Sequence, residues 1–328
     1  MKIILLSLVF IATVMYGSAQ SGQLDPSFGK NGIVKTDFGT LFNYHNYGKH
    51  VLTQSDGSMF FISESADETI IMKKKADGSP DIAYGQNGMS VSASVGGFTG
   101  VIQTDGKIVI VGNCLNTDTY TGGSDIALAR FNVDGSLDNN FGKNGIQVTD
   151  LGDFEGRYTI ALQNDGKIIV AGNQFVTGGG SNVGVIVRCN IDGSLDNTFS
   201  DDGVQKTGAY YNISALAIQN NGKIIVAANG ILLRYNDNGT QDNSFNGNSQ
   251  HIITEYVNSI AIHNDDKVII CRGSTINDID YGFTISRFNA DGTQDITFSE
   301  DGIQTTNLGG SNDVSTSIAI LFKRMEKL

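Results

Sequence analysis

The chain has no tryptophan and few prolines, cysteines or histidines: among its 328 residues are 2 Pro, 3 Cys and 4 His. Cys114, Cys189 and Cys271 fall at three different places in the repeat described below, so no disulfide framework is indicated. We expect plain buried thiols, because a free cysteine behaves as a small hydrophobe. The histidines (His45, His50, His251 and His263) form no HxxxH or Cys/His pattern, which argues against a metal site built on them.

Without tryptophan, stacking on a sugar would fall to tyrosines, and the candidates are Tyr120, Tyr210, Tyr211 and Tyr281. Basic residues are also scarce, with 22 Lys and Arg against 34 Asp and Glu, for a formal net charge of -12. An acidic protein repels phosphates and anionic lipid surfaces. We therefore expect no nucleic-acid partner.

The first 19 residues differ from the rest. Met1 and Lys2 form a positive start, residues 3–15 are apolar, and Gly17-Ser18-Ala19 is a small-residue cleavage site. These features predict a signal peptide over residues 1–19, and a single domain over residues 20–328 that is secreted, periplasmic or on the outer cell surface. The apolar run is shorter than the ~20 residues of a spanning helix, so no transmembrane segment is expected.

One motif pair recurs five times. The two clearest copies cover residues 101–152 and 160–208, and weaker ones cover 51–91, 213–255 and 260–309. Each copy has a first turn of the form Gln-x-Asp-Gly-Lys and a second turn of the form Asn-x-Asp-Gly. First turns recur at spacings of 44 to 60 residues, a period typical of stacked supersecondary units. Most length variation lies between the two turns, where the fourth copy has only Asn229-Gly230, which predicts a two-residue hairpin turn.

Short runs rich in Ile and Val, bounded by turn residues, predict buried strands at 107–112, 167–172 and 223–228. The third copy offers four strands, at 160–163, 167–172, 183–190 and after Gly203. No segment beyond the leader has a long helical period. The sequence therefore predicts an all-β fold, a β-propeller of four-stranded antiparallel blades.

On these motifs the repeats resemble the delta-60 repeat family, a domain of unknown function of β-propeller type that is frequent in bacterial secreted proteins. The resemblance covers roughly residues 24–320. It implies a propeller fold and an envelope location. It transfers no catalytic residue, because the family has no agreed activity.

An arginine stands four residues before the second turn in four copies, and an aspartate follows eight residues after it. The arginines are Arg130, Arg188, Arg234 and Arg287, and the aspartates are Asp138, Asp196, Asp242 and Asp295. We predict a structural Arg–Asp bridge in each blade, since guanidinium geometry suits a carboxylate. The first copy has Lys73 and Asp81, so its bridge is expected to be weaker or absent. The alternative is a ring of arginines that lines the channel and binds an anion.

An aromatic residue also recurs and is predicted to fill the core between blades. The residues at this repeat position are Phe28, Tyr84, Phe141, Phe199, Phe245 and Phe298. Asp134 and Asp192 begin turns that gather carboxylates and hydroxyls, so calcium is an alternative there. However, no copy has a complete calcium loop, and Asp-Gly turns have a sufficient backbone explanation. We therefore expect no catalytic residue, metal or cofactor.

The two ends of the chain carry parts of a repeat. Residues 24–39 read as the end of one copy and residues 314–320 as the first strand of another. We therefore expect five full blades and a split or incomplete sixth. Residues 324–328 (RMEKL) can be encoded so that a shifted frame reads Lys-Asp-Gly-Lys-Ile, which suggests that a frameshift truncated a longer repeat protein.

Two functions fit these patterns. The favoured one is a secreted or cell-surface, non-catalytic scaffold that presents loops 116–125, 174–182 and 273–280 to a protein or glycan. The alternative is an extracellular polysaccharide hydrolase or lyase with its site in the propeller channel. Such a site needs converging acids, bases or metal ligands that break the repeat.

Overall fold

The computed structural model describes residues 24–35, 46–65, 68–92, 95–115, 124–152, 154–175, 181–209, 211–253, 256–276 and 280–307. Within these ranges it has five four-stranded antiparallel sheets and a short 3-10 turn, η2 (Phe245–Gly247). The first sheet comprises β1 (Asn46–Thr53), β2 (Met59–Ser65), β3 (Glu68–Lys74) and β4 (Met89–Ser92). The second comprises β5 (Gly96–Ile102), β6 (Ile108–Leu115), β7 (Ser124–Phe131) and β8 (Ile146–Thr149). The third comprises β9 (Phe154–Leu162), β10 (Ile168–Phe175), β11 (Val183–Cys189) and β12 (Val204–Ala209). The fourth comprises β13 (Ile213–Ile218), β14 (Ile224–Ala228), β15 (Ile231–Tyr235) and β16 (Gln250–Ile252). The fifth comprises β17 (Ser259–Ile262), β18 (Val268–Ile276), β19 (Asp280–Phe288) and β20 (Ile303–Asn307).

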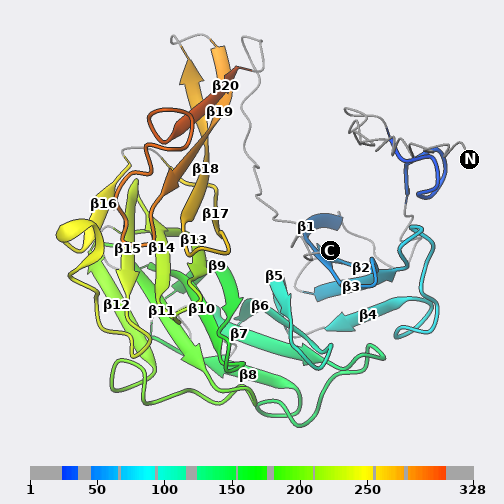
Figure 1. Cartoon of the computed structure of the whole chain (residues 1–328). Coiled ribbons are helices and arrows are strands. Elements are labelled where there is room, and N and C mark those ends of the chain that lie inside the picture. Colours follow the sequence, from blue (N-terminus) through cyan, green and yellow to red (C-terminus); the bar gives the residue numbers. More distant parts are fainter. Residues whose placement is uncertain are drawn as a thin grey trace, which may run out of the picture.

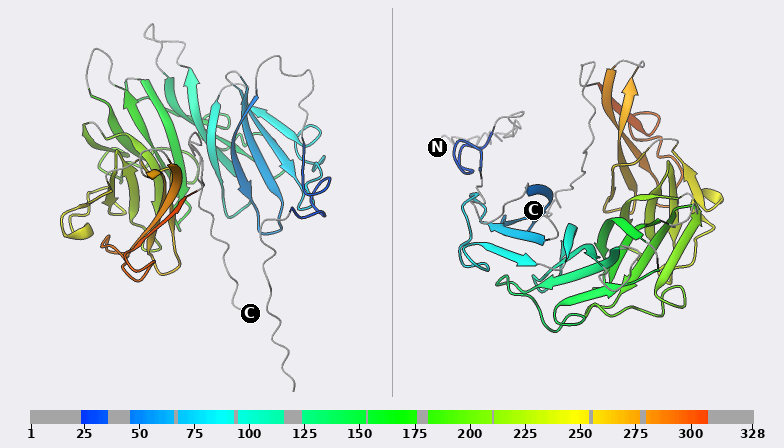
Figure 2. Two further views of the ribbon diagram at one scale, coloured as in Figure 1. Left: turned by 90° about the horizontal axis from the view of Figure 1, so that it is seen from above. Right: turned by 180° about the vertical axis from the view of Figure 1, so that it is seen from behind.

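The sheets follow one another around an arc (Figure 1). In each sheet the strands pair in chain order, and the first strands β1, β5, β9, β13 and β17 contact one another in sequence. The first and fifth sheets stand at the two ends of the arc, as the view from behind also shows (Figure 2). The predicted all-β fold of four-stranded antiparallel blades is confirmed. The C-terminal piece of the expected sixth blade, residues 314–320, lies outside the described residues, as does the leader.

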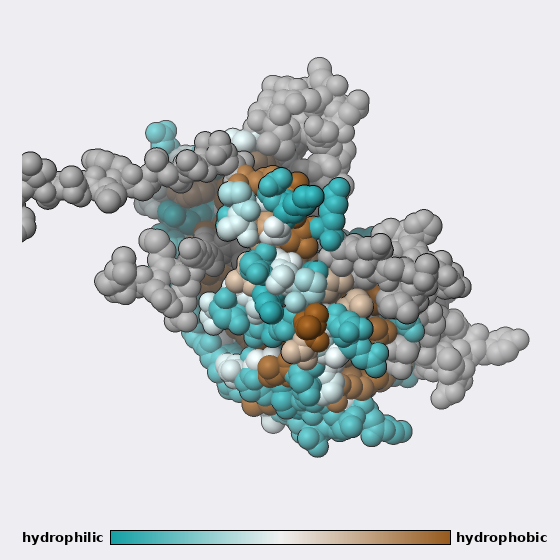
Figure 3. Space-filling model, turned by 90° about the vertical axis from the view of Figure 1, so that its right-hand side faces the viewer, coloured by the Kyte–Doolittle hydropathy of each residue, from teal (hydrophilic) through white to brown (hydrophobic). Residues whose placement is uncertain are grey.

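The second strand is apolar in the second, third and fourth sheets because neighbouring sheets cover both of its faces. Every residue of β10 from Ile168 to Gln174 is buried, and Ile169 pairs with Arg188 of β11. The four strands predicted for the third copy all occur, as β9 to β12. Seen from the side of the first sheet, the described surface alternates hydrophilic and apolar patches (Figure 3).

The turns form as their residues predict. Asp134 Oδ1 accepts hydrogen bonds from the amide of Ser136 at 2.9 Å and from its hydroxyl at 2.7 Å, while Gly135 adopts a φ of 87°. The carboxylate thus stabilises its own turn. Asn229 (φ 45°) and Gly230 (φ 76°) join β14 to β15, so the predicted two-residue hairpin turn is confirmed.

The core consists of layers between successive sheets. Phe141 lies in a cluster with residues of the second and third sheets, Phe199 with the third and fourth, and Phe245 with the fourth and fifth. Cys189 and Cys271 are buried and Cys114 is partly exposed, and none of the three forms a disulfide within the described residues. Burial raises the pKa of the Cys189 thiol to about 12, so this thiol stays protonated at neutral pH.

Candidate functional site

The structure brings the recurring arginines and aspartates together. The Nε atom of Arg130 lies 2.8 Å from Asp138 Oδ2, and the same two atoms are 2.7 Å apart in the Arg234–Asp242 pair and 2.6 Å apart in the Arg287–Asp295 pair. In the third sheet, Arg188 and Asp196 form an ion pair at 2.7 Å. The Asp carboxylates are almost fully buried in all four pairs.

A lysine from the first turn completes each cluster, and we did not predict it. Lys107 Nζ lies 2.8 Å from Asp138 Oδ2, and Lys167, Lys223 and Lys267 repeat this contact at 2.6 to 2.9 Å. Burial opposes ionisation of Asp138, but Lys107, the Asn140 amide and Arg130 outweigh it and lower the pKa of that carboxyl. The sequence signal for this role was the lysine that ends the first turn in four copies, as Asp-Gly-Lys in two of them.

The arginine also reaches the next sheet. Arg130 Nη1 donates to the carbonyl oxygen of Ile191 at 2.6 Å, and Arg234 Nη1 donates to that of Ala290 at 2.5 Å. Arg188 makes the matching bond to the carbonyl of Asp237. Each acceptor immediately precedes the Asp or Asn that begins the second turn of the following sheet.

The recurring aromatic residue completes this junction. The Arg130 guanidinium lies 4.6 Å from the centre of the Phe141 ring, and the other three pairs are 4.7 to 4.8 Å apart. The ring packs on the next second turn, where a Cβ added at Gly193 would lie 2.6 Å from Phe141 Cζ. The amide of Gly142 then donates to Asp192 O at 2.9 Å. We call this set of contacts the inter-sheet junction.

The first copy departs from the pattern as its lysine predicts. Lys73 Nζ lies 3.2 Å from Asp81 Oδ2, a longer contact between more exposed groups. The junction arginines Arg130, Arg188 and Arg234 have side chains only 4 to 7 % exposed. Their guanidinium groups are bound between sheets, so this geometry favours the structural role over an anion-binding ring.

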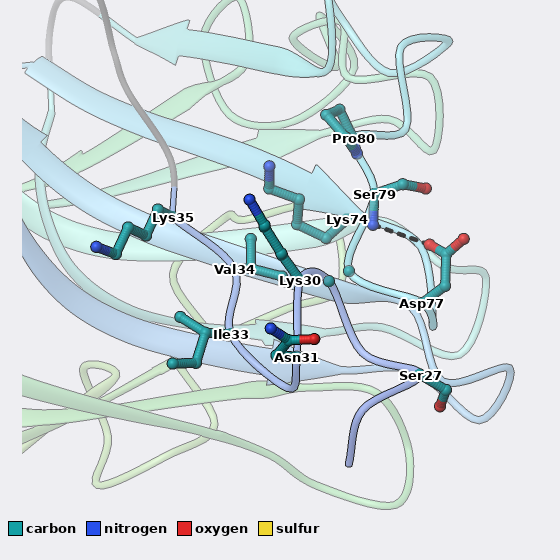
Figure 4. A pocket seen from close by; sticks show the side chains of 12 residues that line it. Ser27, Lys30, Asn31, Ile33, Val34, Lys35, Lys74, Asp77, Ser79 and Pro80 are labelled. Carbon is teal, nitrogen blue, oxygen red and sulfur yellow. Dashed lines mark hydrogen bonds between the residues drawn. The ribbon is translucent and has the colours of Figure 1, made fainter. Parts of the chain in front are cut away.

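A groove with a different character lies between residues 24–35 and the first sheet (Figure 4). Its volume is ≈ 740 Å³, and its lining includes Lys30, Lys35 and Lys74. Lys30 and Lys74 point the same way in this view, whereas the Asp77 carboxylate points away from them and accepts from the Ser79 amide at 2.8 Å. The groove is therefore basic although the chain as a whole is acidic.

The same groove recurs one repeat later without this charge. It has a volume of ≈ 770 Å³ and lies between the loop at residues 83–91 and the turn Asp134-Gly135-Ser136. Gln86 and Val91 occupy the places of Lys30 and Lys35, and Phe131 is the repeat equivalent of Lys74. Lys143 and Lys206 match Lys30 and Lys35 in later copies, but only the first groove combines all three lysines.

Lys74 is unusual because its residue is only 4 % exposed and no acidic partner is found for it among the described residues. Desolvation lowers the pKa of its ammonium group. A bound anion would offset that cost, since an opposite charge favours the ionised lysine. The replacement of the aromatic of Arg-Phe-Asn by Lys74 was visible in the sequence, but we did not single it out.

The other candidate groups do not form a site in the described part of the chain. No group of three or more His, Cys, Asp or Glu residues there could hold a metal ion, and no helix there is long and apolar enough to span a membrane. His263 Nδ1 contacts Asp265 Oδ1 at 2.6 Å on the surface. Residues 116–123, 176–180 and 277–279, which form most of the three variable loops, lie outside the described residues, as do His45, Tyr120 and Tyr210.

Comparison with known proteins agrees with this architecture. Residues 103–141, 163–199 and 219–245 match the family described as "Domain of unknown function (DUF5122) beta-propeller". The matched segments run from the first turn to the recurring aromatic residue, so they include the Arg, Asp and aromatic positions of the inter-sheet junction.

Several solved structures are similar to this chain at low sequence identity. A protein of unknown function from Bacteroides caccae is 12% identical with a TM-score of 0.48, over 79% of this chain and 86% of that one. A glucose dehydrogenase is 10% identical with a TM-score of 0.48, over 81% and 90%. The polysaccharide lyase Uly1 is 10% identical with a TM-score of 0.41, over 86% and 77%. No curated protein matches the chain in sequence.

Proposed function

We propose that the protein is a secreted or cell-surface binding propeller, and that the groove between residues 24–35 and the first sheet binds an anionic group of its ligand. The observation that carries this proposal is Lys74, a lysine only 4 % exposed that lines the groove with Lys30 and Lys35. The repeat-matched groove with Gln86, Val91 and Phe131 supports it, because a binding site must differ from the structural repeat somewhere.

The polar groups that recur in four of the five described sheets support a non-catalytic role. Arg and Lys of the junction both pair with its single Asp carboxylate, and Arg also bonds the neighbouring sheet. These polar groups are therefore already used, whereas the groove is lined by the lysines Lys30, Lys35 and Lys74. Such a set binds a carboxylate, sulfate or phosphate group without activating a nucleophile.

Binding of a uronic-acid polymer tests this function. We expect polygalacturonate to bind the protein, with an affinity that falls as salt rises, and the neutral polymer dextran not to bind. Lys74→Met should weaken the binding of polygalacturonate at least tenfold, whereas Lys143→Met in a later copy should leave it unchanged. Equal binding by the Lys74→Met variant would refute the anion site. Release of unsaturated sugar products from the polymer would instead support the lyase alternative.

A further inference from the structure

The two ends of the arc carry complementary halves of one junction. At the fifth sheet, Arg287 pairs with Asp295 at 2.6 Å and lies 4.8 Å from the Phe298 ring, as in the other junctions. Among the described residues, no second turn meets this pair. The Arg287 side chain is accordingly 24 % exposed, against 4 to 7 % for its three equivalents.

The face around Arg287 is also uncovered. Alternate residues of β19, Phe283, Ile285 and Arg287, are only half-buried. The equivalents of Ile285 in the second and third sheets, Leu128 and Ile186, are at most 2 % exposed because the following sheet packs on them. The fifth sheet therefore has an apolar face that every earlier sheet in this series buries.

The opposite end has the other half. Phe28 packs on the first sheet's second turn, where a Cβ at Gly78 would lie 3.0 Å from its ring, and the Gly29 amide donates to Asp77 O at 2.8 Å. Asp25 occupies the place of Asp138 in this pattern. It accepts from the Ser27 amide at 2.9 Å and from the Ser27 hydroxyl at 2.6 Å. Unlike Asp138, it has no Arg or Lys partner among the described residues.

One structural unit would satisfy both ends. Strands two and three of a repeat bring a Lys and an Arg to the aspartate that follows them, and they end in the Asn-x-Asp-Gly turn that packs on the preceding aromatic. We propose that the exposed end of the fifth sheet and the segment at residues 24–35 together form a docking site for a β-hairpin of this repeat type. The turn of that hairpin would cover Phe298 and Arg287, and its Lys and Arg would pair with Asp25.

The assignment of this partner follows from continuity with the junctions already formed. The described sheets join through the same amide contact four times, and an aromatic ring packs on the glycine of the next turn in three of these junctions. Residues 24–35 make both contacts with the first sheet. Residues 308–328 contain no Asn-x-Asp-Gly sequence, so they do not supply the turn. The site requires shape and charge that a repeat hairpin has and a generic apolar peptide lacks.

The fourth copy supplies a compact probe. A synthetic peptide of residues 219–241 contains the first turn, the Asn229-Gly230 hairpin, Arg234 and the second turn, but it ends before Asp242. Its Lys223 and Arg234 are therefore available to Asp25. The matched control peptide carries Gly239→Val, because a Cβ at Gly239 already meets the aromatic ring at 3.1 Å in the native junction.

Binding of the labelled peptide to the whole chain is then measured by fluorescence anisotropy. We expect the native peptide to bind, and both the Gly239→Val peptide and the Phe298→Ala protein to weaken binding at least tenfold. Asp25→Asn should weaken binding of the native peptide but not further weaken binding of an Arg234→Ala peptide, which shows that one hairpin spans both ends. Equal binding of the native and Gly239→Val peptides, or no binding at all, would overturn the proposal.

Two further measurements separate the alternatives. If the chain forms dimers in sedimentation, and Phe298→Ala converts them to monomers, the occupant is a second copy and the hairpin assignment is wrong. Circular dichroism of Phe298→Ala should match the native chain because the ring is half-buried, and Arg287→Ala provides a second variant at the same end. Polygalacturonate binding by these variants should stay unchanged, so failure here is distinct from failure of the proposed function.

Discussion

Arg130 of the second sheet donates from Nη1 to the carbonyl oxygen of Ile191 in the third sheet at 2.6 Å, while its Nε holds Asp138 at 2.8 Å. One guanidinium thus fixes the end of its own sheet and the position of the next. A rigid planar donor suits this double role, since lysine offers only a point charge. The relationship recurs at Arg188 and Arg234, so the stacking of sheets is specified by polar geometry as well as by apolar burial.

The Arg130 link is expected to contribute strongly to stability. Arg130→Ala leaves Asp138 buried with Lys107 alone, so we expect the free energy of unfolding to fall by about 3–5 kcal/mol. Arg287→Ala serves as the control, because its guanidinium is partly exposed and bonds no following sheet among the described residues; we expect about 1 kcal/mol there. Urea unfolding of both variants measures the difference. Equal losses would show that the inter-sheet bond adds little.

The junction aromatic gives a second matched pair. Phe141 is fully buried between two sheets, whereas Phe298 at the end of the arc is half-buried. Phe141→Ala should lower the free energy of unfolding by about 3–5 kcal/mol because it leaves a cavity. Phe298→Ala should lower it by less than half as much. Thermal unfolding followed by circular dichroism checks this, and a larger loss at Phe298 would contradict the exposed position of its ring.

Acid should unfold the protein through the buried aspartates. Burial opposes ionisation of Asp242, but Lys223, Ser244 and Arg234 together lower its pKa below the ordinary value. A carboxyl with a lowered pKa stabilises the fold above the unfolded value of about 3.9 and loses that contribution as pH falls towards the folded value. We therefore expect the urea midpoint to drop between pH 5 and pH 3.

Asp242→Asn tests the assignment of this acid sensitivity. The variant should be less stable at pH 7, and its urea midpoint should change less between pH 5 and pH 3 than that of the native chain. The exposed Glu300→Gln should retain the native pH profile. If Asp242→Asn kept the full pH dependence, other carboxyls would be responsible.

The repeat made the fold predictable from the sequence. The lysine-lined groove was not predictable in this way. Strand positions, the Asn229-Gly230 turn and the pairing of Arg130 with Asp138 follow from motifs that recur at fixed spacing. Such contacts lie within one copy. The bond from Arg130 to Ile191 joins two copies and depends on how the sheets stack, which no single repeat records.

The groove depends on differences between copies, and these are weak signals in a repeat alignment. Lys74 stands where three other copies have Phe or Tyr and the third has Cys189. From sequence alone, that substitution reads as ordinary drift in an imperfect copy. Only the fold shows that Lys30 and Lys35 approach the same groove from a segment about forty residues away.

Lys74 provides the prediction that separates stability from binding. Burial lowers the pKa of its ammonium group, so the unliganded fold stabilises the charged lysine less than water does. Lys74→Met removes that cost and resembles the apolar residues of the other copies. We expect it to raise the free energy of unfolding by about 1 kcal/mol and, at the same time, to weaken polygalacturonate binding. Raising the pH towards 10 deprotonates Lys74 and relieves the cost of burying its charge. The stability advantage of Lys74→Met over the native chain should therefore shrink as the pH approaches 10.

Lys35→Met, which removes an exposed lysine of the same groove, should weaken binding without the gain in stability. A variant at Lys74 that lost both stability and binding would indicate that this lysine supports the fold and not the ligand.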